Sequence, residues 1–113
     1  MAPNVQRDEI PSGTLDMLIL KTLARGSEMH GFAIAEAIQR TSASVLQVEE
    51  GSLYPALQRM LLKGWIVGEW SKTDENRRAR YYRLTKNGRK HLEQEMAAYR
   101  RVAQAISLIL NPV

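Results

Sequence analysis

The sequence contains no cysteine and only two histidines among its 113 residues. A chain without cysteine cannot form a disulfide scaffold, a thiolate zinc site or a cysteine nucleophile. His30 and His91 lie in different predicted elements, neither has a metal-ligand spacing, and the seven glycines are too scattered to form a phosphate-binding loop. We therefore expect no catalytic residues, no metal and no cofactor, and the protein is not expected to be an enzyme.

Long apolar runs are also lacking. No stretch approaches the roughly 20 apolar residues that a membrane helix needs, and the polar start Met1 to Asp8 is not typical of a signal peptide. Hydrophobic residues make up 44% and charged residues 25% of the chain, which is typical of a soluble globular domain. We expect one cytoplasmic domain, with or without an appendage, and no membrane partner.

Positive charge is concentrated in one segment. The formal net charge is +4, but residues 72–90 hold eight of the sixteen basic residues against two acids, so this segment carries +6 and the rest of the chain −2. Such a segment produces a directional field that attracts a polyanion or an acidic membrane surface, although a solvated loop would have the same composition.

The periodicity predicts three short helices, a β-hairpin and a long last helix. Helices are predicted over 15–25 and 32–41, with residues 29–31 opening the second. A third helix is predicted to begin at Glu49 or Glu50 and to close at Lys63-Gly64. Strands are predicted over 65–70 and 80–84 with a long polar loop at 71–79, and Thr85 caps a helix that ends near Leu110. The order indicates a mainly α fold with a small β-hairpin, the winged helix-turn-helix. We expect an N-terminal arm at 1–12, the winged domain at 13–84 and a dimerisation helix at 85–113.

The third helix is the first candidate site. Leu53, Leu57, Met60 and Leu61 form its inner stripe, which leaves a small, polar and flat face outside. That face suits a helix whose first turns enter the major groove, although an ordinary core helix with a solvated face is the alternative. Its candidate DNA-binding residues are Ser52, Tyr54, Pro55, Gln58 and Arg59.

The hairpin is the second candidate site. A basic loop beside the third helix could reach phosphates or the minor groove. Its candidate DNA-binding residues, which we expect near the loop tip or just after it, are Lys72, Arg77, Arg78 and Arg80. Tyr82 and Leu84 alternate with Tyr81 and Arg83 and are expected to pack inward. At least one of the two tryptophans, which lie on opposite strand faces by parity, is expected in the core.

The last helix carries a seam of apolar residues spaced four and three apart, namely Leu92, Met96, Tyr99, Ala103, Ile106 and Leu110. This is the a/d spacing of a coiled coil, and one small domain cannot cover all of it. Pairing with a second copy would bury the seam, whereas folding back onto the same domain is the alternative. A two-fold homodimer would present two third helices and two hairpins to a pseudo-palindromic duplex.

Particular motifs resemble a known family. They are the segments 18–23, 29–32, 47–57 (which contains Gly51-Ser52-Leu53-Tyr54-Pro55-Ala56-Leu57), 63–66 and 77–85, followed by Gly88. Over residues 15–110 the chain resembles the PadR family of transcriptional regulators, in its short branch with a single C-terminal helix. The resemblance implies a dimeric winged-helix repressor. It assigns DNA contacts to Ser52, Tyr54 and Pro55 and to Arg77, Arg78 and Arg80.

The partners expected from the sequence are double-stranded DNA and a second copy of the chain, with a small-molecule effector of unidentified chemistry as a further candidate. The alternative function is a winged-helix protein-interaction module that does not bind DNA. The basic segment argues against that alternative, since protein interaction alone does not require it, and steeply salt-dependent binding to duplex DNA would separate the two. An RNA-binding function ranks third, because exposed aromatic residues on a sheet are not evident.

Overall fold

The computed structural model describes residues 8–11 and 13–112, so most of the expected arm at 1–12 lies outside the described residues. The elements are α1 (Leu15–Arg25), β1 (Met29–His30), α2 (Gly31–Thr41), α3 (Glu50–Leu62), β2 (Ile66–Lys72), β3 (Arg78–Leu84) and α4 (Lys86–Leu110). Four helices with a small antiparallel sheet confirm the predicted winged-helix fold. No helix within the described ranges is long and apolar enough to cross a membrane.

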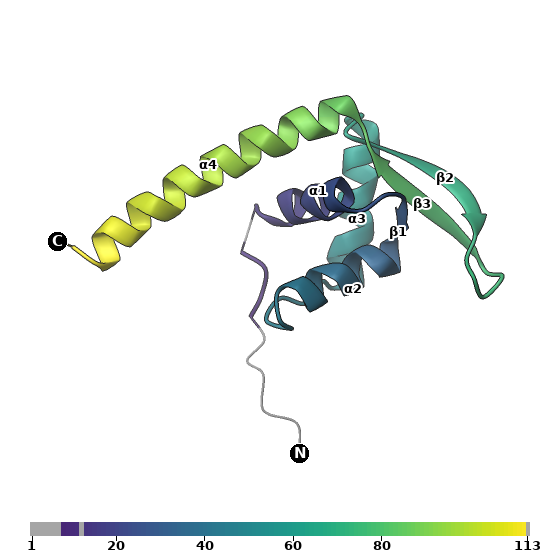
Figure 1. Cartoon of the computed structure of the whole chain (residues 1–113), viewed down its shortest axis with the longest axis horizontal. Coiled ribbons are helices and arrows are strands. Elements are labelled where there is room, and N and C mark those ends of the chain that lie inside the picture. The colour runs from purple at the N-terminus through teal and green to yellow at the C-terminus, as the bar shows by residue number, and fades with distance from the viewer. Residues whose placement is uncertain (1–7, 12, 113) are drawn as a thin grey trace, which may run out of the picture.

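The core lies where α1, α2 and α3 meet the base of the sheet and the start of α4. Figure 1 shows α1, α2 and α3 packed together, with the β2–β3 hairpin projecting on one side and α4 extending on the other. Every helix contributes an apolar stripe, as the periodicity predicted. The core residues are Met17, Ile19, Leu20, Leu23, Ile34, Ile38, Leu53, Ala56, Leu57, Met60, Ile66, Tyr82 and Leu92.

The sheet differs from the prediction in two ways, and the first is a third strand. The strand order is β1–β3–β2, and Met29 and His30 pair with Tyr82 and Tyr81 directly before α2 begins at Gly31. His30 then caps α2, because its Nδ1 accepts a hydrogen bond from the Ala33 amide at 3.2 Å. A two-residue strand is too short for any periodicity to reveal, so the sequence prediction missed it.

The second difference is the length of the hairpin. The prediction of a long loop at 71–79 was wrong, because pairing continues through Ser71↔Ala79 and Lys72↔Arg78. Thr73 and Arg77 close the short loop: the Thr73 amide donates to the Arg77 carbonyl at 2.7 Å, and the Arg77 amide donates to the Thr73 hydroxyl at 3.2 Å. Asn76 supplies the left-handed residue with φ of 63°, a conformation that asparagine tolerates. Lys72 and Arg78 therefore belong to strands, and of the predicted basic residues Arg77 is at the tip.

The junction before α4 is tightly packed. The Thr85 hydroxyl accepts a hydrogen bond from the Gly88 amide at 3.0 Å, which confirms the predicted cap, and lies 2.7 Å from the Gly64 carbonyl. A Cβ at Gly88 would collide with the Trp65 carbonyl oxygen. The Trp65 ring also stacks on His91, with 3.6 Å between ring centroids. These contacts fix the direction in which α4 leaves the domain.

Candidate nucleic-acid interface

The N-terminal turns of α3 present small and flat side chains to solvent. Ser52 and Pro55 are exposed, whereas Leu53 is buried in the core beneath them. Pro55 lies inside the helix, and because it has no N–H, the Gly51 carbonyl does not receive the usual helical hydrogen bond from it. The surface at this end of α3 is therefore a proline ring, a hydroxyl and a freely accessible backbone, which is shaped for close approach to another molecule.

Tyr54 joins this surface to the start of α2. Its side chain is 48% exposed, and its ring covers Gly31, where an added Cβ would lie 3.0 Å from the Tyr54 Cε1 atom. Burial raises the pKa of the neighbouring Tyr82 phenol, an effect that the Arg80 guanidinium opposes and Tyr54 reinforces. Tyr54 thus has both a packing contact and an accessible edge.

The last two candidates on α3 lie further along the helix. Gln58 and Arg59 are both exposed. The Arg59 guanidinium forms an ion pair with Asp16 of α1, with 3.0 Å between Nη2 and Oδ1. Arg59 is therefore already engaged in holding α3 against α1, whereas Gln58 is on the helix surface beyond Tyr54 and Pro55.

The hairpin formed by residues 66–84, hereafter the wing, has one face that continues the core outward. Its directly opposed pairs on that face are, from base to tip, Ile66↔Leu84, Gly68↔Tyr82, Trp70↔Arg80 and Lys72↔Arg78. Ile66 and Tyr82 are buried, so the prediction that Tyr82 packs inward is confirmed. The inner face of the wing is thus apolar at its base and cationic toward its tip, with Trp70 between the two regions.

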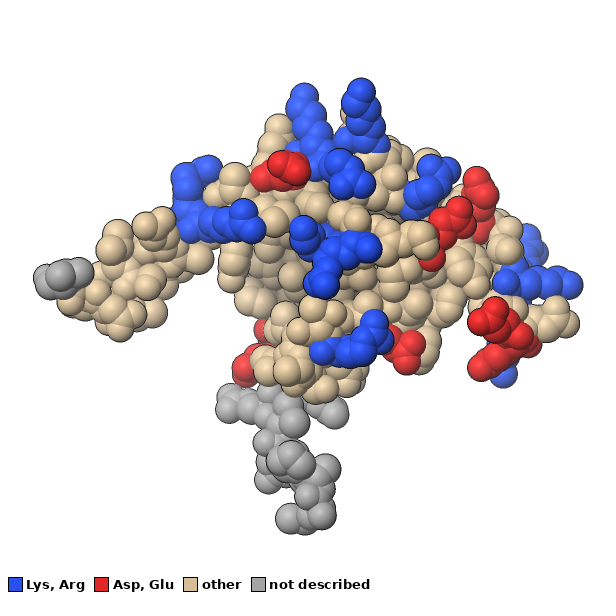
Figure 2. All heavy atoms as spheres, in the orientation of Figure 1, with Lys and Arg blue, Asp and Glu red and all other residues tan. Residues whose placement is uncertain are grey.

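An open groove of about 1100 Å³ separates the wing from the start of α2. The walls come from the inner wing residues Trp70, Arg78 and Arg80 and, opposite them, from His30, Phe32 and Tyr54. Phe32 is largely exposed, and His30 contacts Tyr81 edge-on with ring centroids 5.5 Å apart. The groove brings together the wing and Tyr54 of α3, as a joint interface requires. Figure 2 shows basic side chains at the end of the wing with acidic ones beside them.

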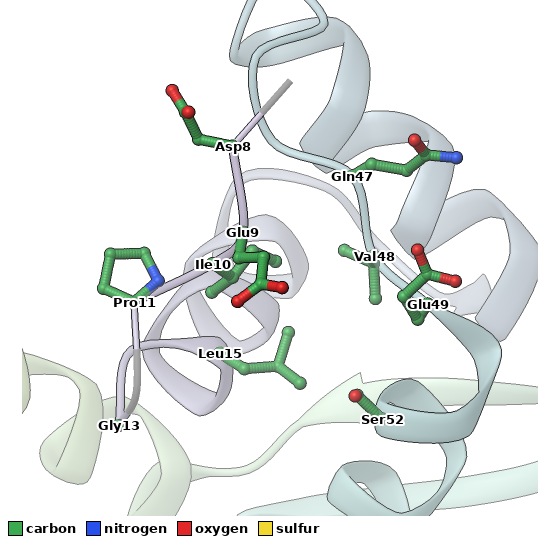
Figure 3. Close-up of a pocket in the computed structure, with 10 residues that line it drawn as sticks. All are labelled: Asp8, Glu9, Ile10, Pro11, Gly13, Leu15, Gln47, Val48, Glu49 and Ser52. Atoms are coloured by element: carbon green, nitrogen blue, oxygen red, sulfur yellow. The ribbon is translucent and has the colours of Figure 1, made fainter. Parts of the chain in front are cut away.

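A second hollow, of about 530 Å³, lies on the other side of the α3 N-terminus. Figure 3 shows it between residues 8–11 with Gly13 on one side and the start of α3 on the other, with Ser52 at one edge. The Asp8 amide donates to the Val45 carbonyl at 2.9 Å, which holds this segment in place. Carboxylates of Glu9 and Glu49 line the hollow, and such negative charge disfavours a phosphate backbone there. The carboxylates of Glu36, Asp74 and Glu75 also line the wing groove, but three arginines offset them there, whereas the described lining of this hollow contains no basic residue. The balance of charge therefore favours the wing side of α3 for a polyanion.

Among the residues that the structure describes, no three His, Asp or Glu side chains form a group that could hold a metal ion.

The comparison with protein families identifies the chain. The sequence profile of the transcriptional regulator PadR-like family matches residues 19–94. The chain belongs to the PadR family. A curated relative, "Uncharacterized protein X" of Lysinibacillus sphaericus, is 26% identical over 105 residues, which are 93% of this chain and 95% of that protein.

Solved structures agree with this membership. A transcriptional regulator from Clostridium thermocellum is 26% identical with a TM-score of 0.76, and the match covers 84% of this chain and 91% of that one. A PadR family transcription regulator from Clostridium difficile R20291 is 30% identical with a TM-score of 0.73, covering 88% of this chain and 100% of that one. A PadR-like transcriptional regulator from Bacillus cereus is 25% identical with a TM-score of 0.74, covering 89% and 95%. The protein is therefore a transcriptional regulator of the PadR family.

The α4 helix of this PadR-family chain divides the predicted seam into two parts. Leu92 is 4% exposed in the chain's own core, and Met96 packs against that core. Beyond them the helix leaves the domain (Figure 1), and its large apolar residues are exposed. We call the exposed residues Tyr99, Val102, Ile106, Ile109 and Leu110 the distal stripe. Ala103, also predicted in the seam, is half-buried. A single copy thus covers the first part of the seam and leaves the second open.

Proposed function

We propose that this protein is a sequence-specific DNA-binding repressor that binds a pseudo-palindromic operator as a homodimer in the cytoplasm. The observation that carries the proposal is the groove between α3 and the wing, which Tyr54 of α3 and the cations Arg77, Arg78 and Arg80 of the wing line together, with the small, flat N-terminal face of α3 next to Tyr54. Membership of a transcriptional-regulator family supports the same function. We also propose that residues 13–84 act as the DNA-binding unit and residues 85–113 as the dimerisation unit.

Base reading is assigned in this proposal to the α3 N-terminus. Ser52 could donate a hydrogen bond to a base edge, and the Pro55 ring could lie against a thymine methyl group. Tyr54 could reach a phosphate or base with its hydroxyl, and Gln58 extends the same surface. Arg59 is expected to contribute least to DNA contacts, because its guanidinium would have to leave or share its ion pair with Asp16.

Phosphate contacts are assigned to the wing. Lys72, Arg77, Arg78 and Arg80 supply the cations, and no ion pair neutralises any of the four within the described residues. Unpaired cations next to a groove are the arrangement that releases counterions when a duplex binds, so binding should weaken steeply with salt.

Dimerisation is assigned to the distal stripe. Ile109 is 77% exposed in one copy, and after Arg101 the helix has no charged residue. A long, uncharged apolar strip of this kind normally marks a protein interface. A two-fold dimer paired through it would present two α3 helices to the two half-sites of a duplex, which in helix-turn-helix operators lie about 34 Å, or one turn, apart.

An effector of unidentified chemistry remains part of the proposal. The hollow of Figure 3 is its candidate location, because Ser52 borders both that hollow and the proposed reading surface. A compound that binds there should lower operator affinity.

The decisive experiment is selection of genomic fragments by the purified dimer, followed by gel-shift titration of the enriched fragment against a shuffled duplex. Recovery of one inverted-repeat sequence that binds at nanomolar protein is expected. Absence of any enriched sequence, with no duplex binding at low salt, would instead favour a winged-helix module for protein partners.

A further inference from the structure

We propose that Trp70 is a positioning residue that holds the wing arginines in place for DNA without neutralising them. The inference rests on the proposed DNA-binding function and adds to it a residue that does not itself need to touch the duplex. The geometry is specific: the Arg78 Cζ atom lies 4.7 Å from the centre of the Trp70 ring, and the Arg80 Cζ atom lies 6.0 Å from it.

The strand register explains why one ring reaches two guanidinium groups. Arg80 is directly opposite Trp70, and Arg78 is its diagonal neighbour on the same face. Both positions are within the reach of long side chains across an antiparallel pair. Gly68 leaves room for the stem of Arg80, since a Cβ there would lie 2.6 Å from the Arg80 Nε atom. The Nε group is buried and, among the described residues, has no hydrogen-bond partner.

Packing against the ring, rather than hydrogen bonding, therefore restrains these arginines. An indole is the strongest aromatic partner for a cation, and it has no formal charge. A carboxylate in the same place would order the arginines equally well but would cancel the charge that attracts phosphate. Trp70 is 58% exposed, which is unusual for so large an apolar ring and is explained if its role is to support the cations beside it.

Ordering the arginines before binding lowers the entropy lost when they contact phosphates. Trp70→Leu keeps an apolar side chain but removes the π face. We expect it to weaken binding of the operator and of a random duplex alike by about fivefold, which corresponds to about 1 kcal/mol. Trp70→Phe should recover most of the affinity. Val67→Ala, on the outer face of the same strand, is the matched control and should leave affinity unchanged.

A double-mutant cycle separates positioning from direct contact or wing stability. In an Arg78→Gln, Arg80→Gln background, Trp70→Leu should have no further effect, because the cations that it holds are gone. An equal fivefold loss in that background would overturn the inference.

Fluorescence tests the arrangement without DNA. In a Trp65→Phe protein, Trp70 is the only tryptophan. The ratio of iodide to caesium quenching of its emission should exceed the ratio for a neutral free indole, and Arg78→Gln with Arg80→Gln should lower it toward that reference. A ratio that does not change when both arginines are removed would overturn the inference. If the parent protein does not bind duplex DNA, the proposed function and this inference both fail. If the parent binds and Trp70→Leu leaves the affinity for DNA unchanged, the inference alone fails.

Discussion

Replacing Ile106 with aspartate should convert the proposed dimer to monomers without unfolding the domain. Ile106 is 50% exposed in a single copy, so about half of its surface is left for a partner to bury. Full burial of an isoleucine is worth about 1.5–3 kcal/mol, which gives about 1 kcal/mol per copy and about 2 kcal/mol per dimer. Two unpaired carboxylates in the interface add at least about as much again. The loss of dimerisation free energy from both effects together is near 4 kcal/mol, which raises the dimer dissociation constant about a thousandfold.

Sedimentation equilibrium at several concentrations measures this change directly. Gln104→Asp is the matched control, because it introduces the same charge about 200° around the helix from Ile106, at an exposed position outside the distal stripe. The control should remain dimeric, and both variants should melt like the parent, since neither site belongs to the core. If Ile106→Asp stays dimeric at the parent's affinity, or if Gln104→Asp dissociates equally, the distal stripe is not the interface.

Gly88→Ala should destabilise the domain by about 1–3 kcal/mol, because the added methyl group would collide with a backbone carbonyl that precedes β2; an unchanged thermal melt would refute this packing. Pro55→Ala and Ser52→Ala should keep the fold and the dimer but reduce the ratio of operator to random affinity by about 1–3 kcal/mol per lost base contact. If both variants keep the parent's ratio of operator to random affinity, base reading must instead come from the wing or from DNA shape. Arg77→Ala with Arg78→Ala should flatten the slope of log K against log salt by about 0.9 per lost phosphate contact, and an unaltered slope would mean that the wing does not touch the backbone.

The helices could be predicted because each rests on a local signal. The inner stripe of α3, the glycine that ends it and the Thr85 cap all act within a few residues, and the structure has each of them in place. Gly64 adopts φ of +75° after α3, as a helix-ending glycine does. The family resemblance, carried by the motifs around Ser52 and Arg80, is confirmed by the profile match over residues 19–94.

The wing could not be predicted in detail because its register depends on where the chain turns. The polar residues 71–79 contain several positions that could form the turn, and the Thr73–Arg77 closure selects one of them. That choice places Trp70 beside Arg80, a contact that no sequence spacing reveals without the register. The sequence also could not show which part of the α4 seam the domain itself covers. The seam has the same spacing along its whole length, and only the tertiary contacts of Leu92 show where the covered part lies.

The most direct test of the central claim is a fluorescence-anisotropy titration of the parent protein with its selected operator and with a random duplex, at salt concentrations from about 50 to 200 mM. A sequence-specific regulator should bind the operator at least about a thousandfold more tightly at physiological salt, and both affinities should fall linearly in log–log form with slopes set by the wing cations. Equal affinity for the two duplexes, or an affinity that does not change with salt, would contradict the account.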